Sequence, residues 1–428
     1  MRIRWKHKLR SGALQFTIFI SVIIALLLAG VIILFSTHRF FLGQSKAAID
    51  NIRLADSGIE YLCNQQTLSP DTITLEIPET TDAQSVKIHL TRWGIYEKAY
   101  VEATHRKKKF IKTALIGSRF LTENRNSLYL QETFKPLMVV GTTRIEGKAS
   151  LPEQGVRTGN ISGHSYYNDQ LVYGPVERSA IKLPKLKYNY TDIVSYYLNE
   201  YKPINEEEYL ALESGSKIIN SFINPAKGYL SSSVITLEDI SLTGNIIIQS
   251  QEKIIVKNSA VLKDIILAAP VIEIEDNFQG SLQAFANETI KVGKKCRLEY
   301  PSSLILSEKE IQNPNAAFNA LQNKIHIDVE TKIKGSICYL QSKPEPGFLT
   351  NIHIGLKSSV AGEVYCEGNL ELRGNVKGSV YTNQFIANEG GTVFINHLYN
   401  VSITDGLPEN FGGILFENEK KSVVKWLY

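Results

Sequence analysis

Residues 253–292 read KIIVKNSAVLKDIILAAPVIEIEDNFQGSLQAFANETIKV, and apolar residues recur in this stretch with a fixed period. Ile254, Ile272 and Ile290 are 18 positions apart, and Val256, Ile274 and Val292 follow the same spacing. A helix has no reason to keep this register through Asn, Gly and Pro. A coiled β-solenoid keeps it, because each repeat is one lap and equivalent side chains stack roughly 4.8 Å apart. The stretch therefore predicts a β-solenoid with these six side chains in its core.

Two further columns share the period of 18 residues. One contains Leu242, Ala260, Phe278 and Cys296, and the other contains Ile248, Ile266 and Ala284. We expect both columns to continue the same stack of rungs.

A second repetitive run lies between Lys324 and Thr382, where three segments align on Gly335, Gly362 and Gly378. Each glycine precedes an Ile- or Val-centred strand, which predicts a corner that needs a positive φ or lacks room for a Cβ atom. In this alignment Cys338 matches Tyr365 and Cys366 matches Tyr339. The two cysteines should point to opposite faces, so we expect no disulfide between them.

The N-terminal region has a different pattern, SGALQFTIFISVIIALLLAGVIIL at positions 11–34. No charged side chain occurs from Ala13 to Phe35, a segment that spans roughly 34 Å as a helix and exceeds a bilayer core of about 30 Å. Five basic residues precede it and no small-x-small cleavage site follows it. The pattern predicts one transmembrane helix in the inner membrane, with a cytoplasmic N-terminus and a periplasmic or surface-displayed remainder.

An amphipathic stripe continues this helix beyond the membrane. Its members are Ala48, Ile52, Ala55, Ile59 and Leu62, at alternating spacings of four and three. The stripe is explained either by docking on the next domain of the chain or by packing against similar helices in a bundle.

These patterns divide the 428 residues into segments. The expected order is a basic leader (1–12), a helix (13–64), a small antiparallel β domain (65–135), first solenoid-like rungs (137–185), a helical insertion or linker (186–228), a β-solenoid (229–405) and a C-terminal cap or tail (406–428). The fold class is therefore mainly β with an N-terminal transmembrane helix, a small α+β domain and a solenoid. The net charge of +4 gives no case for nucleic-acid binding.

The first 62 residues resemble type IV pilin-like proteins, specifically minor pilins of the PilX type and the K-type minor pseudopilin of type II secretion. The basic leader, Gly12 before the apolar run and the segment ADSGIEYL carry this resemblance. It implies that a prepilin peptidase cuts after Gly12, that Ala13 becomes the first mature residue, and that the helix joins a filament bundle. Thr17 occupies the fifth mature position, where most pilins have glutamate. The K-type pseudopilins also lack it, which fits a subunit at a filament tip.

Residues of about 230–400 resemble a bactofilin-type β-helix in rung length and in the xGx[IV] pattern. This resemblance implies fold more strongly than function, because rung architecture is shared by unrelated proteins.

Catalytic chemistry is weakly indicated. Glu273 and Glu275 are expected on a solvated strand face, and no nucleophile elbow, zinc-protease motif or P-loop occurs. His326, His353 and Glu371 occupy matched positions in successive rungs, so a metal site is one interpretation and an exposed polar ladder is the other. The tyrosine pairs at 166–167 and 196–197 suggest either a glycan-binding groove or a covered sheet surface.

The leading hypothesis is a structural, non-enzymatic protein without a cofactor. It would act in a type IV pilus-like or secretion filament, with the lipid bilayer, pilin-like subunits or copies of itself, and the prepilin peptidase as partners. A membrane-anchored bactofilin-like scaffold and a glycan-binding or carbohydrate-active β-helix are the alternatives.

Overall fold

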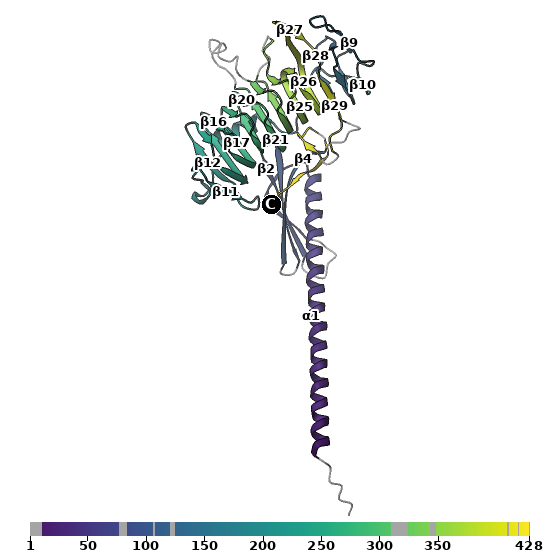
Figure 1. Cartoon of the computed structure of the whole chain (residues 1–428), viewed down its shortest axis with the longest axis vertical. Helices are drawn as coiled ribbons and strands as arrows, with labels where there is room; N and C mark the ends of the chain where they lie inside the picture. Colours follow the sequence, from purple (N-terminus) through teal and green to yellow (C-terminus); the bar gives the residue numbers. More distant parts are fainter. Residues whose placement is uncertain are drawn as a thin grey trace, which may run out of the picture. The chain divides into compact units, whose positions relative to one another are not determined.

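The computed structural model describes residues 11–76, 84–105, 108–119, 125–309, 324–342, 348–408, 411–417 and 419–427. Helix α1 (Ser11–Asn64) is followed by a chain that is mostly β-strand, as Figure 1 shows. The predicted fold class, mainly β with a long N-terminal apolar helix and a parallel solenoid, is confirmed. The chain divides into two compact units, which are described separately.

The first unit joins the second half of α1 to strand segments within residues 73–88 and 101–111. Its strands belong to a sheet with the order β1 (Ser69–Glu76), β2 (Gln84–Trp93), β3 (Tyr96–His105) and β4 (Lys108–Arg119). A Cβ atom added at Gly58 would lie 2.7 Å from Cγ1 of Val101 and 3.2 Å from Cγ1 of Val86. The glycine therefore lets the helix backbone approach the sheet closely.

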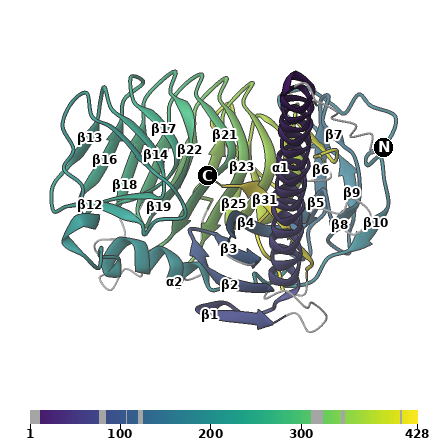
Figure 2. The same ribbon diagram turned by 90° about the horizontal axis from the view of Figure 1, so that it is seen from below.

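The second unit contains the solenoid, whose successive rungs lie side by side in Figure 2. Its strands from the 217–404 region are β11 (Lys217–Asn220), β12 (Lys227–Ser231), β13 (Ile235–Leu237), β14 (Ser241–Gly244), β15 (Ile246–Ser250), β16 (Lys253–Val256), β17 (Val261–Ala268), β18 (Val271–Ile274), β19 (Gln279–Ala286), β20 (Thr289–Val292), β21 (Arg297–Ser307), β22 (Lys324–Ile327), β23 (Lys332–Leu340), β24 (Ile352–Ile354), β25 (Ser359–Leu372), β26 (Asn375–Glu389), β27 (Thr392–Ile395), β28 (His397–Tyr399) and β29 (Ser402–Thr404).

The predicted core columns of this solenoid are confirmed. Parallel pairing places Ile254 opposite Ile272 and Ile272 opposite Ile290, and it stacks Val256, Ile274 and Val292 in the same way. All six side chains are buried in one apolar cluster. The first column continues through Ile235, Ile325, Ile352 and Leu370. Alternation along each short strand sends these side chains inward, so the column forms the spine of the core.

The two other predicted columns are wrong at their first step, because the early rungs are longer than 18 residues, and the second of them is also wrong at its next step, because Ile266 pairs with Gln283 and not with Ala284. Leu242 pairs with Leu262, and Ile248 pairs with Leu267, so each partner lies one or two positions beyond the expected one. An irregularity around Asp264, whose φ is +57°, shifts the register within β17. A shift of one residue moves a side chain to the opposite face of a strand. Ile266 consequently points away from the solenoid core.

The predicted corner glycines are also confirmed. Gly335, Gly362 and Gly378 pair with one another in neighbouring strands and have φ angles of +143°, +153° and +138°. A Cβ atom at Gly362 would lie 1.8 Å from the carbonyl oxygen of Gly335. The backbones of adjacent rungs therefore approach too closely for any side chain at these positions.

The rungs in residues 128–178 occupy an unexpected place. Their strands are β5 (Leu128–Leu130), β6 (Leu137–Val140), β7 (Arg144–Ile145), β8 (Ala149–Leu151), β9 (Val156–Thr158) and β10 (Val176–Arg178). Parallel pairing stacks β5 on β26, β6 on β28 and β7 on β29. The segment predicted as first rungs is thus solenoidal, but it extends the C-terminal end of the stack, and it begins within the range assigned to the small β domain.

The helical insertion predicted for residues 186–228 is only partly present. It contains α2 (Tyr190–Ser195), the π-helical turn η1 (Tyr196–Glu200) and the 3₁₀ turn η2 (Glu206–Glu208), with Asn189 capping α2 through its side chain. The chain then enters β11 and β12, so the stack begins at Lys217 and not at residue 229.

The C-terminal segment was predicted to be a cap of the solenoid or a tail, and the cap interpretation is wrong. Its strands β30 (Gly412–Gly413) and β31 (Lys421–Trp426) pair antiparallel with β4 instead. The tail therefore completes the small sheet. Its hydrogen-bonding edge is satisfied there, which removes an exposed strand edge from β4.

The solenoid strands are apolar on both faces, and we call their outward side, where several large side chains are buried, the solenoid face. It comprises Ile247, Ile266, Phe285, Ile305, Cys338, Tyr365 and Tyr381. Three other segments cover this face within the same apolar cluster: the β2–β3 turn, a strap of residues 181–201 that contains α2 and η1, and the tail around Phe416. Cys338 belongs to this face and Cys366 to the solenoid core, and both are free thiols, as the alignment predicted.

Alanine substitution of Gly362 tests the rung geometry. We expect Gly362→Ala to lower the free energy of unfolding by about 3 kcal/mol or more, because the new methyl group meets a backbone oxygen at a left-handed position. Gly390→Ala is the control: its φ is +58° but a Cβ atom there meets nothing within 4 Å. It should cost only about 1–2 kcal/mol. Thermal and urea unfolding of the detergent-solubilised chain measures both, and equal losses would contradict the account.

Candidate functional site: the apolar helix and the solenoid face

The first half of α1 has the surface of a membrane-spanning helix. Among the described residues, α1 is the one helix long and apolar enough to cross a bilayer, and its most apolar part packs on nothing else in the chain. Its hydroxyl groups are satisfied inside the helix: Thr17 Oγ1 donates to the carbonyl of Leu14 at 2.9 Å, and Ser21 Oγ donates to that of Ile18 at 2.9 Å. These hydroxyl groups therefore do not depend on water for a hydrogen bond, which suits a lipid environment.

The predicted cleavage position lies at the beginning of this helix. Gly12 and Ala13 are exposed in its first turn, and nothing lies within 4 Å of the position a Gly12 side chain would take. The basic leader, residues 1–10, lies outside the described residues. Cleavage after Gly12 stays a prediction.

The second half of α1 confirms three of the five predicted packing residues. Ala55, Ile59 and Leu62 are buried, whereas Ala48 and Ile52 are exposed, so the prediction for these two as docking residues is wrong. The buried side instead includes Asn51, whose Nδ2 donates to the carbonyl of Lys108 at 3.0 Å, and Gly58. The sequence pattern considered only apolar residues, and it therefore did not include Asn51 and Gly58 in the docking face of the helix.

Docking leaves one apolar side of the helix exposed. Ile49 is 47% exposed and Ile52 is 41% exposed, three positions apart along the helix. Residues at this spacing lie next to each other on a helix surface. They form a small apolar strip outside the bilayer segment.

The matched register of His326, His353 and Glu371 is confirmed, but the three side chains form a ladder. The two imidazole rings stack with centroids 4.7 Å apart and an interplanar angle of 6°. His353 Nδ1 lies 3.0 Å from Oε2 of Glu371. Stacked rings do not direct their nitrogens at a common ion. Within the described ranges no group of three or more His, Cys, Asp and Glu side chains has the arrangement of a metal site.

The carboxylates considered for carbohydrate chemistry are paired with lysines along the rungs. Lys253 Nζ lies 2.9 Å from Glu273, and Lys257 Nζ lies 2.6 Å from Glu275. The glutamate side chains are 39% and 41% exposed, as expected for a solvated strand face. This arrangement is an outward salt-bridge ladder with little net energy.

A buried ion pair fixes the tail to the solenoid. The guanidinium of Arg125 contacts the carboxylate of Glu363 on β25, and both side chains are almost fully buried. Oε2 of Glu363 also accepts a hydrogen bond of 2.5 Å from the backbone amide of Ile414 in the tail. Burial raises the pKa of Glu363 to about 7, although the Arg125 charge acts in the opposite direction.

A second buried carboxylate, Glu97 on β3, collects three further partners. Lys421 of the tail lies 2.5 Å from it, Lys187 of the strap lies 3.3 Å from it, and the hydroxyl of Tyr188 donates to it. Glu97 therefore ties the small sheet, the strap and the tail together at one point. Removing one charged side chain from this cluster would leave an opposite charge buried without its ion-pair partner.

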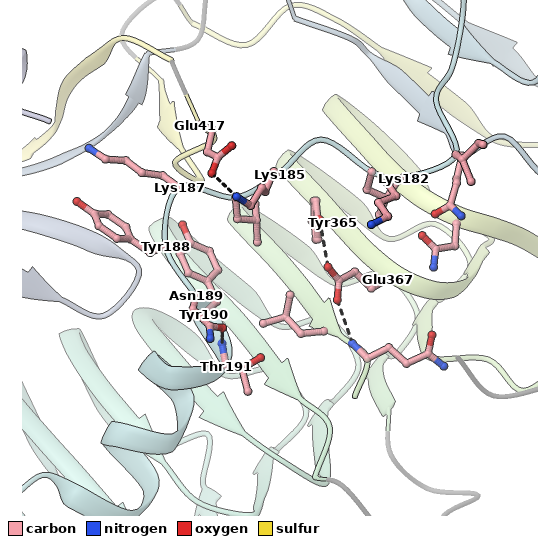
Figure 3. A pocket seen from close by; sticks show the side chains of 17 residues that line it. Lys182, Lys185, Lys187, Tyr188, Asn189, Tyr190, Thr191, Tyr365, Glu367 and Glu417 are labelled. Atoms are coloured by element: carbon pink, nitrogen blue, oxygen red, sulfur yellow. Dashed lines mark hydrogen bonds and ion pairs between the residues drawn. The ribbon is translucent and has the colours of Figure 1, made fainter. Parts of the chain in front are cut away.

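The strap roofs a cavity of about 740 Å³ on the solenoid face, seen in Figure 3. Lys182, Lys185 and Lys187 lie along one side of it, and Glu367 lies on the opposite side. Lys185 pairs with Glu417 at 2.7 Å, and Glu367 accepts hydrogen bonds from the hydroxyl of Tyr365 and the amide of Gln341. Burial raises the pKa of Glu367. Most of these charges are thus already satisfied within the chain.

Of the solenoid face, sequence reasoning placed only Cys338 correctly, and of the strap that covers it only Tyr196 and Tyr197 were singled out. The hairpin, strap and tail that meet there are separated by about a hundred residues or more and share no motif. The one available signal was that strands such as residues 264–268 (DIILA) are apolar on both faces, which indicates that an outward surface is covered.

Among solved structures, a pilin shows similarity to this chain. The crystal structure of the competence-associated pilin ComZ from Thermus thermophilus is similar over 85% of this chain and 88% of that chain, with 8% sequence identity and a TM-score of 0.27. No protein-family model matches the chain, and no curated protein matches it. The fold and sites described above therefore rest on the geometry of the chain itself.

The Arg125–Glu363 pair generates a prediction with a defined pH dependence. Arg125→Met should cost about 3–5 kcal/mol at pH 8, because it leaves a buried carboxylate without its cation. A carboxyl whose pKa is raised by folding contributes stability at low pH that is lost as the pH rises through its folded value. The cost should therefore shrink towards pH 5.

The matched control is the double variant Arg125→Met/Glu363→Gln, which removes both charges. We expect it to recover much of the lost stability and to abolish the added pH dependence. Urea unfolding at pH 5, 6.5 and 8 measures this double-mutant cycle. A double variant that is as unstable as the sum of the single variants would show that the two groups are not coupled.

Proposed function

We propose that this chain is a pilin-like membrane protein that acts in a filament of the type IV pilus or type II secretion kind. In this proposal the N-terminus is cytoplasmic, α1 crosses the inner membrane, and the solenoid is periplasmic or displayed on the filament. The protein acts by contact and not by catalysis: α1 packs among the helices of other subunits, and the solenoid presents a surface.

The observation that carries the proposal is the two-part character of α1. One uninterrupted helix combines an apolar half, whose hydroxyl groups are internally satisfied, with a half that docks on its own sheet through Asn51, Ala55 and Gly58. A plain membrane anchor needs no such extension. A subunit whose helix enters a shared bundle and also docks on its own sheet does need it, and the exposed Ile49 and Ile52 supply an apolar strip for a neighbouring helix.

Processing after Gly12 by a prepilin peptidase is part of the proposal. Cleavage there would remove the basic leader and place Ala13 at the N-terminus of a segment that has no charged side chain up to Phe35. Apart from the new α-amino group of Ala13, no charge in this segment then opposes its transfer from the bilayer to an apolar bundle.

Thr17 places the subunit at a special position in this proposal. In the pilins that the N-terminus resembles, a glutamate at the fifth mature position pairs with the terminal amine of the preceding subunit. Thr17 is a neutral residue whose hydroxyl is already bonded within α1. A subunit with threonine at this position lacks the carboxylate that pairs with the terminal amine of the preceding subunit. This absence fits a minor subunit at a filament tip.

Thr17→Glu tests this assignment. We expect the substitution to change the incorporation of the protein into sheared filaments or pseudopili of its native host several-fold, because it creates the pairing group of an ordinary subunit. Immunoblotting of the filament and membrane fractions measures the ratio. Ser21→Glu is the matched control, since Ser21 has the same internal hydrogen bonding one turn further along. It should only burden membrane insertion, and an identical response of both variants would contradict the proposal.

A further inference from the structure

A second cavity, of about 510 Å³, lies entirely within the second unit. The β2–β3 hairpin contributes Arg92, Trp93 and Lys98, the strap contributes residues from Asn189 to Tyr201, and the early rungs contribute Asn245 and Ile247. This volume is within the roughly 300–1,000 Å³ typical of small-molecule sites. None of the filament chemistry discussed above uses this cavity.

Aromatic rings form one wall of the cavity and hold one another in place. Tyr197 stacks on Phe285 of β19 with centroids 4.9 Å apart, and Tyr196 meets Tyr197 edge-on at 5.2 Å. Trp93 packs edge-on against Phe222 at 5.2 Å. Tyr196 is 44% exposed, so part of its ring remains open to a ligand. Such a wall offers a flat apolar surface with polar tips.

Lys98 is a cation of this wall for which the described residues supply no counter-ion. Lys98 is half-buried, and the described part of the chain gives its ammonium group no ion pair and no hydrogen bond. Burial lowers the pKa of Lys98 accordingly. Arg92 adds a second positive charge, stacked on Tyr188 with its guanidinium 4.2 Å from the ring centroid. An incompletely solvated cation is stabilised by an anion that enters the cavity.

The cavity also carries polar atoms that the described residues do not satisfy. Oδ1 of Asn245 and the hydroxyl of Tyr201 are buried without a hydrogen-bond partner, while Nδ2 of Asn245 donates to the carbonyl of Asn224. The Asn245 oxygen needs a donor, and the Tyr201 hydroxyl offers one. Asp192, in the first turn of α2, is a further acceptor on the lining.

We propose that this cavity binds a carboxylate-bearing sugar unit of a glycan. The carboxylate pairs with Lys98 and Arg92, the apolar face of the sugar ring packs on Tyr196, and the ring hydroxyls serve Asn245 and Asp192. The proposal goes beyond the filament role, because it concerns what the solenoid recognises and would hold for any mode of membrane anchoring.

The mixture of groups distinguishes this ligand from other anions. A phosphate or sulfate would bring a larger negative charge close to Asp192, and it would not donate to Asp192 or to the Asn245 oxygen when fully ionised. A neutral sugar would leave Lys98 without a counter-ion. A sugar with one carboxylate and several hydroxyls supplies a single anion together with both donors and acceptors.

Calorimetric titration of the purified full-length chain tests the proposal. A zwitterionic detergent is required, because a sugar-based detergent would compete for the cavity. The probes are a hyaluronan tetrasaccharide, the N-acetylglucosamine–N-acetylmuramic acid disaccharide, neutral chitotetraose and acetate. We expect at least one carboxylated glycan to bind about tenfold or more tightly than chitotetraose, and acetate not to bind measurably at the same concentration.

Variants locate the binding. Lys98→Met keeps the length and apolar stem of the side chain and should weaken binding of the carboxylated glycan about tenfold or more. Tyr196→Ala should weaken it as well, since the ring is lost while the charges remain. Lys332→Met removes an exposed lysine elsewhere on the solenoid and should leave binding unchanged.

The proposal would be overturned by no binding of either carboxylated glycan at millimolar concentration, by equal binding of chitotetraose, or by unchanged binding by both Lys98→Met and Tyr196→Ala. Binding of acetate as tight as that of the glycans would show an anion site without sugar recognition, and would also overturn it. Unchanged melting temperatures of the variants establish that any loss is local. None of these results depends on whether the chain enters a filament.

Discussion

The structure depends on covering the outward face of the solenoid. Winding apolar strands into a stack buries one side of each strand in the core, but residues such as Ile266, Phe285 and Ile305 point the other way. Exposed together they would form a continuous apolar strip, which soluble proteins avoid. The hairpin, the strap and the C-terminal tail together cover this face. The buried carboxylates of Glu97 and Glu363 hold them in place through ion pairs and hydrogen bonds.

This constraint explains the order of the chain. The rungs of residues 128–178 are placed behind β26 and β29, so the chain must return to the other end of the stack before it winds forward from β11. The return path is the strap, and it serves at the same time as the cover of the solenoid face. The cavity lined by Lys98 and Tyr196 arises where this strap and the β2–β3 hairpin meet the early rungs. In our proposal the strap therefore has two roles: it covers the solenoid face, and it lines a binding site.

Sequence reasoning succeeded where a single local pattern decides the structure. The column of Ile254, Ile272 and Ile290 was predictable because each rung repeats the same requirement, and the glycines at 335, 362 and 378 were predictable because close backbones exclude a side chain. It failed near Asp264, where one residue changes the register of the strand. It also failed for residues 128–178 and for the tail, where short strands without a repeat pair with strands that are distant in the sequence. On α1, Asn51 and Gly58 form part of the docking face, and a search for apolar residues alone did not find them.

The central claim is that α1 is a processed pilin-like helix and not an ordinary anchor. Intact-mass analysis and N-terminal sequencing of the protein from its native membrane test it most directly. The account predicts a chain that begins at Ala13, because the cut follows Gly12 at the boundary between the basic leader and the apolar helix. A chain that still begins at Met1 would contradict the account, and Gly12 would then be an incidental residue of a permanent membrane anchor.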